Sequence, residues 1–212
     1  QEQSNKQQEI RGDYFIKFLF DFNITNISSC LDIGSGDGLI LNKFKTIYDL
    51  NLCIGIEPSN KRRKKCLDLG LDVKSQIGQI DKKLKFDMII LSHILEHVYN
   101  PKIYLNKIKN MLTPGGYLLI EVPNLFGHIS YERTHLYCFW SKSLKNLLQS
   151  LGFKILLLKK HSTTHPNAKG YRYITCIVQL THKEKEIRSY NMKLIKFFRK
   201  IGTSRLAKLI RF

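Results

Sequence analysis

The chain has 212 residues, which is enough for one domain with its own apolar core and too few for a second full domain. An excess of 35 Lys and Arg over 17 Asp and Glu gives a formal charge of +18, which favours anionic partners without selecting among phosphates, nucleic acid and an acidic membrane face. The 5 cysteines form no C-x-x-C pair, which argues against a disulfide framework and a zinc ribbon.

No apolar run reaches the roughly 20 residues of a membrane span, and the first residues are polar rather than the apolar core of a signal peptide. We therefore expect a cytoplasmic protein, with the inner face of the membrane as the alternative location.

The first predicted element is a helix over Glu9–Phe22, whose apolar residues recur at helical spacing and would cap the domain. From residue 30 onward, short apolar runs alternate with amphipathic segments, which is typical of a parallel sheet with crossover helices. The predicted strands are Cys30–Ile33, Leu52–Ile56, a weaker Leu71–Lys74, Phe86–Leu91 and Tyr117–Val122. The predicted helices between them are Leu39–Ile47, Asn60–Leu69 and Pro101–Leu112.

The second half of the chain predicts a different connection. A helix over Ser141–Leu151 precedes two strands, Phe153–Leu158 and Tyr171–Leu180, which are joined by a polar loop without helical period. Such a pair forms an antiparallel hairpin at the edge of the sheet. We therefore predict an α/β fold over residues 1–182, doubly wound and Rossmann-like, with a mostly parallel sheet and an antiparallel C-terminal hairpin.

Residues 183–212 are predicted to be a separate basic tail. Ile187–Phe212 holds eight Lys or Arg and no acid, with apolar residues at roughly helical spacing. Such a helix could pack on the sheet or on a second subunit, rest on an anionic membrane, or grip RNA. The other cationic run, Lys61–Lys65, is interpreted as the solvated face of a crossover helix.

The strongest motif is Leu31–Gly38, LDIGSGDG, in which a strand leads into a glycine-rich turn and a helix. Glycines let the backbone approach a ligand closely, and the helix N-terminus offers free N–H groups. The pattern is G-x-G-x-G rather than the dinucleotide G-x-G-x-x-G, because residue 39 is Leu. Its acids, Asp32 and Asp37, suit a ligand that carries an ammonium and would repel a pyrophosphate. Glu57, at the end of the next strand, could take both hydroxyls of an adenosine ribose.

Four ordered motifs resemble the class I S-adenosylmethionine-dependent methyltransferase superfamily, in particular its ubiquinone-pathway-like branch of methyltransferase types 11 and 23. They are DIGSGDG, GIEPS, FDMIILSHILEHV and LTPGGYLLIEVPN, and the resemblance covers about Cys30 to Leu180. It implies a seven-stranded sheet, S-adenosyl-L-methionine as cofactor and S-adenosyl-L-homocysteine as product. The alternatives are a dinucleotide oxidoreductase and a pseudoenzyme that keeps the fold. The assigned cofactor contacts are Asp32, Gly34, Ser35, Gly36, Gly38, Glu57, Pro58, Gln76, Ser92 and His93; for the adenine contact Gln79 and Asp81 compete with Gln76.

Methyl transfer needs alignment of donor and acceptor and, for a hydroxyl acceptor, a base. The loop Tyr131–His135 lies where this branch places its acceptor, so His135 is the first choice for the base and Arg133 for an anion contact. The catalytic prediction also includes His93, which follows the fourth strand. The predicted substrate contacts are Arg11, Tyr14, His97, Arg133 and His135.

The segment His93–His97, HILEH, resembles the E-x-x-E-H of related ubiquinone-pathway enzymes and of small-RNA 2′-O-methyltransferases, with His93 in place of the first Glu. Its two imidazoles and Glu96 could hold a divalent ion that His135 completes. Alternatively, Glu96 and His97 begin a helix and orient His93. We predict no metal, and keep His93, Glu96, His97 and His135 as the alternative ligand set.

The sequence thus predicts O-methylation of a small polar, glycan-linked or phosphorylated acceptor in surface-polysaccharide or related biosynthesis. One alternative is a metal-assisted RNA 2′-O-methyltransferase. Another is a non-catalytic module of the same fold that docks on membrane or nucleic acid through its basic tail. The predicted partner is a small or glycan-linked acceptor, with nucleic acid less favoured and peripheral membrane contact by the tail as a further expectation.

Overall fold

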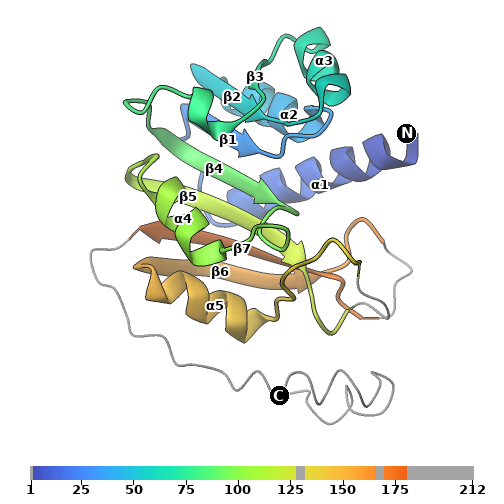
Figure 1. Ribbon diagram of the computed structural model, residues 1–212, viewed down its shortest axis with the longest axis vertical. Helices are drawn as coiled ribbons and strands as arrows, with labels where there is room; N and C mark the ends of the chain where they lie inside the picture. The colour runs from blue at the N-terminus through green and yellow to red at the C-terminus, as the bar shows by residue number, and fades with distance from the viewer. Residues whose placement is uncertain (1, 128–131, 166–169, 181–212) are drawn as a thin grey trace.

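The computed structural model describes residues 2–127, 132–165 and 170–180, which form one seven-stranded sheet flanked by helices (Figure 1). The helices are α1 (Glu2–Phe20), α2 (Leu39–Tyr48), α3 (Asn60–Asp68), α4 (Pro101–Lys109) and α5 (Ser141–Ser150), with a short 3-10 helix η1 (Ile77–Gln79). The strands are β1 (Ser29–Ile33), β2 (Leu52–Ile56), β3 (Asp72–Lys74), β4 (Phe86–Ser92), β5 (Leu112–Pro123), β6 (Phe153–His161) and β7 (Tyr173–Leu180).

The strand order is β3-β2-β1-β4-β5-β7-β6. The first five strands pair in parallel, whereas β7 is antiparallel to both β5 and β6. The predicted doubly wound sheet with an antiparallel terminal hairpin is therefore confirmed. Because β6 runs in the same direction as β5, its carboxyl end joins those of β1, β2 and β4 at one edge of the sheet, called the carboxyl edge below.

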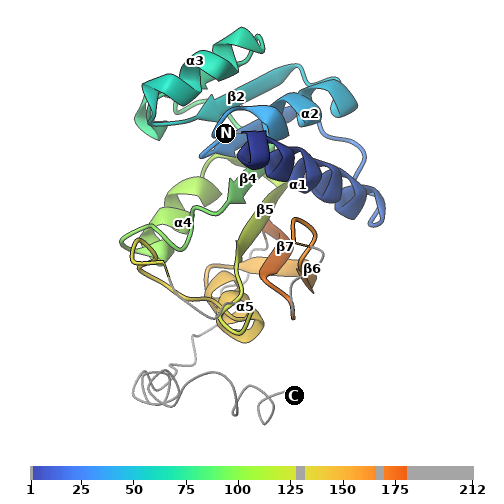
Figure 2. The same cartoon turned by 90° about the vertical axis from the view of Figure 1, so that its right-hand side faces the viewer.

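Both faces of the sheet are buried, which is why its parallel strands are apolar at consecutive positions. α1 and α2 cover one face and α4 and α5 the other (Figures 1 and 2). Along β4, Met88 and Ile90 contact the α1 side, and Ile89 and Leu91 contact the α4 side. α1 is anchored by its second half, where Phe15 and Leu19 are fully buried. Its polar first half continues past the carboxyl edge (Figure 1).

The predicted boundaries of α1, α4 and β5 were wrong. α1 begins at Glu2 rather than Glu9, because the apolar period detects only the half that packs on the sheet, whereas Gln, Lys and Glu extend a helix without burial. α4 ends at Lys109 rather than at Leu112, and β5 begins at Leu112 rather than Tyr117. Leu112 already pairs with Phe86, and a register shift before Met88 accommodates the intervening glycines.

The predicted tail, residues 183–212, lies outside the described residues. Among the residues that are described, no helix is both long and apolar enough to cross a membrane.

Asp87 joins three strands at the opposite, amino edge of the sheet. Its Oδ2 accepts hydrogen bonds from Ser28 N at 3.0 Å, Ser28 Oγ at 2.7 Å and Ser29 N at 3.1 Å, and its Oδ1 accepts one from Thr113 Oγ1 at 3.0 Å. Partial burial alone would raise the pKa of Asp87, but the hydrogen bonds from Ser28, Ser29 and Thr113 outweigh it and lower the pKa. This carboxylate fixes where β1, β4 and β5 begin.

We expect Asp87→Ala to destabilise the protein by about 2 kcal/mol, because it removes several hydrogen bonds to a charged group. Since the folded pKa is lowered, the stabilisation is present above the unfolded pKa of about 3.9 and is lost as the pH falls through the folded value. Urea unfolding at neutral pH measures the effect. Asp68→Ala, at the exposed end of α3, is the control and should change stability little. Equal stability of the two variants would contradict the anchoring role.

Candidate functional site

The turn after β1 depends on three glycines. Gly34, Gly36 and Gly38 have φ of +81°, +60° and +84°, a conformation that residues with a Cβ rarely adopt. A Cβ at Gly34 would lie 2.2 Å from Ile94 Cδ1, and one at Gly38 would lie 2.8 Å from Leu71 Cδ1. The predicted glycine motif is therefore a tightly packed turn at the carboxyl edge.

Glu57 ties the end of β2 to this turn. Its Oε2 accepts a hydrogen bond from Gly36 N at 3.0 Å, and its Oε1 accepts one from Ser59 N at 2.8 Å. Ser35, also buried, donates its N–H to Ile56 O at 3.0 Å. Glu57 thus shapes the turn with both oxygens, and its contact with a ribose stays a prediction.

Asp32 is buried beneath the same turn. Its Oδ2 has no hydrogen-bond partner within the described residues, and neither has the buried Oε1 of Gln8, whose side chain lies against Gly36. Burial, together with the charge of Glu57, raises the pKa of Asp32 to about 7. Two unpartnered acceptors beside a glycine turn fit an ammonium group, so the residues present fit the amino acid end of S-adenosylmethionine.

The cationic run of α3 contacts this turn, and its interpretation as a purely solvated face was wrong. Lys65 Nζ lies 2.6 Å from Asp37 Oδ2. The Arg63 guanidinium donates to Glu57 O at 2.7 Å and to Pro58 O at 2.6 Å. Lys61 and Lys64 remain exposed. Part of the run therefore fixes the loop that carries Glu57, because backbone carbonyls after β2 need donors.

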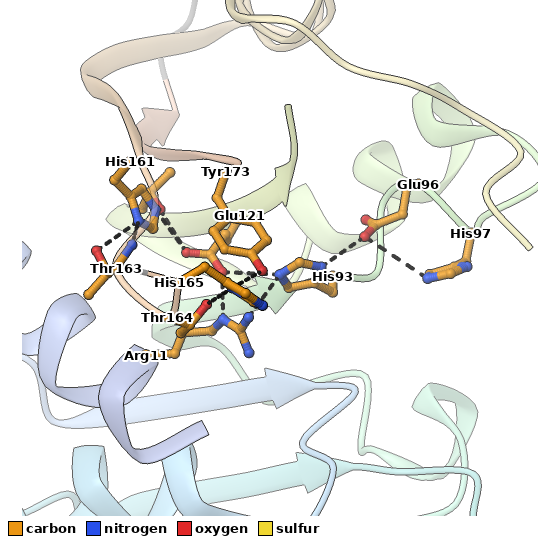
Figure 3. Close-up of polar contacts among 11 residues, drawn as sticks. Arg11, His93, Glu96, His97, Glu121, His161, Thr163, Thr164, His165 and Tyr173 are labelled. Carbon is orange, nitrogen blue, oxygen red and sulfur yellow. Dashed lines mark hydrogen bonds and ion pairs between the residues drawn. The ribbon is translucent and has the colours of Figure 1, made fainter. Parts of the chain in front are cut away.

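Glu121, on β5, is the centre of the polar network drawn in Figure 3. Its Oε1 lies 2.5 Å from Arg11 Nε and 3.1 Å from His93 Nε2. Its Oε2 lies 3.1 Å from His161 Nε2 and 3.0 Å from Thr175 Oγ1. Burial alone would raise the pKa of Glu121, but His161, His93 and Arg11 bring it well below its ordinary value. Glu121 is therefore an ionised, fully buried carboxylate.

His93 bridges Glu121 to a second buried carboxylate. It has φ of 56°, which is unusual for a residue with a side chain. Its Nδ1 lies 3.3 Å from Glu96 Oε1, and its Nε2 also lies 3.1 Å from the Arg11 guanidinium. Burial lowers the pKa of His93, but Glu121 and Glu96 outweigh this effect and raise it. Both ring nitrogens have partners, so the geometry suits a positioning role better than that of a free base.

A pocket of about 230 Å³ opens beside His93 at the carboxyl edge. His97 Nδ1 lies 3.1 Å from Thr134 O and must donate to it, which leaves Nε2 unprotonated in the neutral ring. The His97 and His135 rings meet edge to face at 4.8 Å. The pocket is lined by His93, His97, Pro123, Asn124, Leu125, Glu132, His135, Tyr137, Cys138 and Tyr173.

Glu96, His97 and His135 offer ligand atoms that all lie within 4.8 Å of one another. Glu96 is buried, and within the described residues its oxygens make no hydrogen bond, although Oε1 lies 3.3 Å from His93 Nδ1. A carboxylate and two imidazoles suit a divalent transition metal, and a carbonyl on the far nitrogen of His97 is the usual support of a metal-bound histidine. Three members of the alternative ligand set thus fit a cation, whereas the fourth, His93, is not part of this group.

The other predicted site residues do not line the pocket. Arg133 is exposed on the loop beside it, and Tyr131 lies outside the described residues. The Tyr14 ring is partly buried between α1 and β6, where it stacks on the His161 ring with the centroids 4.0 Å apart. Gln76 is exposed after β3 and caps η1, and Ser92 ends β4 opposite Glu121. Their contacts with cofactor or acceptor stay predictions.

Three residues of the network were missed from the sequence: Glu121, His161 and Tyr173. Tyr173 lines the pocket, and the Arg11 guanidinium lies 5.6 Å from the centre of its ring. His161 is the last residue of β6, which runs in the same direction as β5. The direction of the predicted strand could therefore have placed His161 at the carboxyl edge. An acid in the apolar run YLLIEVP could likewise have indicated Glu121.

A sheet in this order, with a glycine turn after β1, an acid after β2 and a polar pocket after β4 and β5, defines a class I methyltransferase fold. The family described as methyltransferase domain matches residues 5–158. The chain therefore belongs to the methyltransferase-domain family, within the S-adenosylmethionine-dependent superfamily. The predicted family, fold and cofactor are thereby confirmed.

Among relatives, the chain is 28% identical over 150 residues to a tRNA U34 carboxymethyltransferase of Aliivibrio fischeri, covering 59% of this chain and 44% of that protein. It is 26% identical over 101 residues to a ubiquinone biosynthesis O-methyltransferase of Shewanella pealeana, covering 44% of this chain and 43% of that protein. The chain thus spans less than half the length of these curated relatives.

Two solved structures share the fold. A SAM-dependent methyltransferase from Archaeoglobus fulgidus superposes with a TM-score of 0.64 at 17% identity, covering 82% of this chain and 94% of that one. The 1,6-didemethyltoxoflavin-N1-methyltransferase of Burkholderia thailandensis, with bound S-adenosylhomocysteine, gives 0.62 at 18% identity, covering 78% and 76%.

We expect S-adenosylhomocysteine to bind more weakly as the pH falls below 7, by about tenfold per pH unit, because protonated Asp32 cannot neutralise the ligand's ammonium. Affinity should level off above pH 7, where the carboxylate is ionised. Asp32→Asn should weaken binding about 10- to 100-fold at pH 8 and abolish this pH dependence. Calorimetric titration across this range measures both effects. If the affinity of Asp32→Asn for S-adenosylhomocysteine changed with pH as steeply as that of the wild type, a group other than Asp32 would be responsible for the pH dependence.

Proposed function

We propose that the protein transfers a methyl group from S-adenosylmethionine to a hydroxyl of a small polar acceptor in the pocket at the carboxyl edge. The observation that carries this proposal is the convergence of His93, His97 and His135 on that pocket, beside the glycine turn. The cofactor supplies an electrophilic methyl on a positively charged sulfur, so a hydroxyl acceptor must lose its proton to react. One of the relatives described above is named an O-methyltransferase.

His135 is the proposed general base. It comes from the β5–α5 connection and faces His97 across the pocket, and its Nε2 lies 3.5 Å from Glu132 Oε2. A carboxylate beside an imidazole stabilises the imidazolium formed when it takes a proton. His93 would hold the β4 turn in place through its two carboxylate partners rather than take the proton itself.

The finer substrate prediction remains a glycan-linked or phosphorylated acceptor in surface-polysaccharide or related biosynthesis. It is supported by the small size of the pocket and by Arg133, an exposed guanidinium on the loop beside it that could contact an anionic group. A screen of catechol, sugar phosphate and RNA acceptors for release of S-adenosylhomocysteine tests it. An acceptor methylated on nitrogen or carbon alone would contradict the O-methyl assignment.

With an acceptor in hand, His135→Asn should lower kcat by about 100- to 10,000-fold, because a positioned base contributes that much to proton removal. Binding of S-adenosylhomocysteine should stay as in the wild type, since His135 is separate from the glycine turn. Steady-state kinetics and calorimetry provide the two measurements. An unchanged kcat would exclude His135 as the base.

A second candidate is the same reaction assisted by a divalent cation, the mechanism that an RNA 2′-O-methyltransferase would use. It is favoured by the buried carboxylate of Glu96, which lies beside His97 and His135 and has only the His93 ring as an ion-pair partner within 3.5 Å in the described residues. When bound there, a cation would lower the pKa of the acceptor hydroxyl. Glu96 and the two histidines would hold it, while His93 would still orient Glu96.

If this candidate holds, Mn²⁺ should bind the wild type with 1:1 stoichiometry in calorimetric titration, and both Glu96→Gln and His97→Asn should abolish binding because each removes a ligand. Glu132→Gln, which removes an exposed carboxylate at the same pocket, is the matched control and should bind nearly as well. Chelator should stop turnover with an RNA acceptor that ends in a free 2′-hydroxyl. Full turnover in the presence of chelator would exclude the cation-assisted reaction and favour proton removal by His135 alone.

The third alternative, a non-catalytic module, finds no support in the described residues. The methyltransferase family, the unpartnered Asp32 and the imidazole-lined pocket all favour an enzyme. Docking by the basic tail falls on residues 183–212, outside the described part of the chain.

A further inference from the structure

Exposed apolar side chains gather beside the acceptor pocket. In the described part of the chain, five of the eleven exposed large apolar residues lie on two segments, the β4–α4 region and the β5–α5 connection. These five, called the apolar rim, are Tyr99 (90% exposed), Ile103 (56%), Phe126 (51%), Leu136 (58%) and Tyr137 (40%). Apolar groups gathered around a binding pocket commonly mark a contact surface.

The two segments form one surface. Tyr137 Oη donates to Tyr99 O at 3.0 Å, and the backbone N–H groups of Leu136 and Tyr137 donate to Glu96 O at 2.8 and 3.1 Å. Tyr137 also lines the pocket, as does Leu125, the neighbour of Phe126. The rim therefore includes one residue of the pocket lining, Tyr137, and the neighbour of another.

The charges beside the rim are mainly positive. Lys102 and Lys107 are exposed on α4, and Arg133 is exposed on the loop before Leu136. Glu132 is the exposed acid on the same loop, and it faces His135. With a net charge of +18 on the whole chain, this combination of apolar and cationic side chains suits an anionic lipid surface.

The rim also fits lipid better than single-stranded nucleic acid. Bases could stack on the rings of Tyr99, Phe126 and Tyr137, but Ile103 and Leu136, 56% and 58% exposed, are aliphatic and offer no such face. Apolar insertion into a bilayer requires no stacking geometry.

We propose that the apolar rim docks on an anionic lipid surface, so that the acceptor pocket opens at the membrane–water interface. None of the rim residues belongs to the basic tail, residues 183–212. The inference goes beyond the proposed function, and only the orientation of the pocket towards an acceptor rests on that function.

Co-sedimentation of the full chain with phosphatidylcholine vesicles containing phosphatidylglycerol tests the proposal without any catalytic step. The rim variant carries Tyr99→Ser, Ile103→Ser and Leu136→Ser. The control carries Phe20→Ser, Phe22→Ser and Ile47→Ser, three apolar side chains at the amino edge that are 44%, 45% and 50% exposed. The single variant Leu136→Glu provides a milder change. Binding of S-adenosylhomocysteine verifies that each variant is folded.

We expect the wild type and the control to bind the anionic vesicles, and the rim variant to bind about tenfold more weakly or worse, with Leu136→Glu between them. Pure phosphatidylcholine should retain less of the wild type. The proposal is overturned if the rim variant sediments like the wild type, because another surface would then bind the vesicles. It is also overturned if the wild type does not sediment with anionic vesicles. Loss of binding to a single-stranded RNA probe in the rim variant, without vesicle binding by the wild type, would identify RNA as the partner instead.

Discussion

The site depends on one buried carboxylate, Glu121. An unpaired charge in a protein interior costs several kcal/mol, so Glu121 is tolerated only because Arg11, His93, His161 and Thr175 all contact it. These partners come from α1, the turn after β4, β6 and β7. Removing the charge of Glu121 would leave the Arg11 guanidinium without its anion. Removing any one partner would leave the buried carboxylate with less compensation for its lost hydration. A single side chain therefore fixes four elements relative to one another.

This constraint explains why α1 extends beyond the sheet. Asp32 and Glu121 both lie on the face that α1 covers, where Cys30, Ile90 and Leu119 of the same strands and of β4 are buried and apolar. The second half of α1 closes that face with Phe15 and Leu19, and its first half brings Gln8 to the glycine turn and Arg11 to Glu121. The glycine turn and the Glu121 network thus share one covering helix, so a change at either can reach the other through α1.

Much of this could be predicted from the sequence, because strand period and glycine spacing are local signals. The strands around Asp32 and Glu57 and the antiparallel hairpin were predicted correctly, since apolar runs and breaks define them directly. The polar network around Glu121 was not predicted, because it joins residues as far apart in the sequence as Arg11 and Glu121 through tertiary packing. His93 was singled out, but its two carboxylate partners depend on a left-handed backbone that the letters HILEH do not reveal.

The same electrostatic reasoning applies to Glu96, the second buried carboxylate. Neither of its oxygens has a hydrogen bond, so its charge must be balanced by the surrounding imidazoles or by a cation. Enzymes with E-x-x-E-H place a carboxylate where this chain has His93, and the exchange puts a neutral or positive ring 3.3 Å from Glu96. A cation would meet less negative charge here and would need both His97 and His135 as ligands. The cluster is therefore suited to a weakly held, exchangeable ion or to none, and not to a permanently bound one.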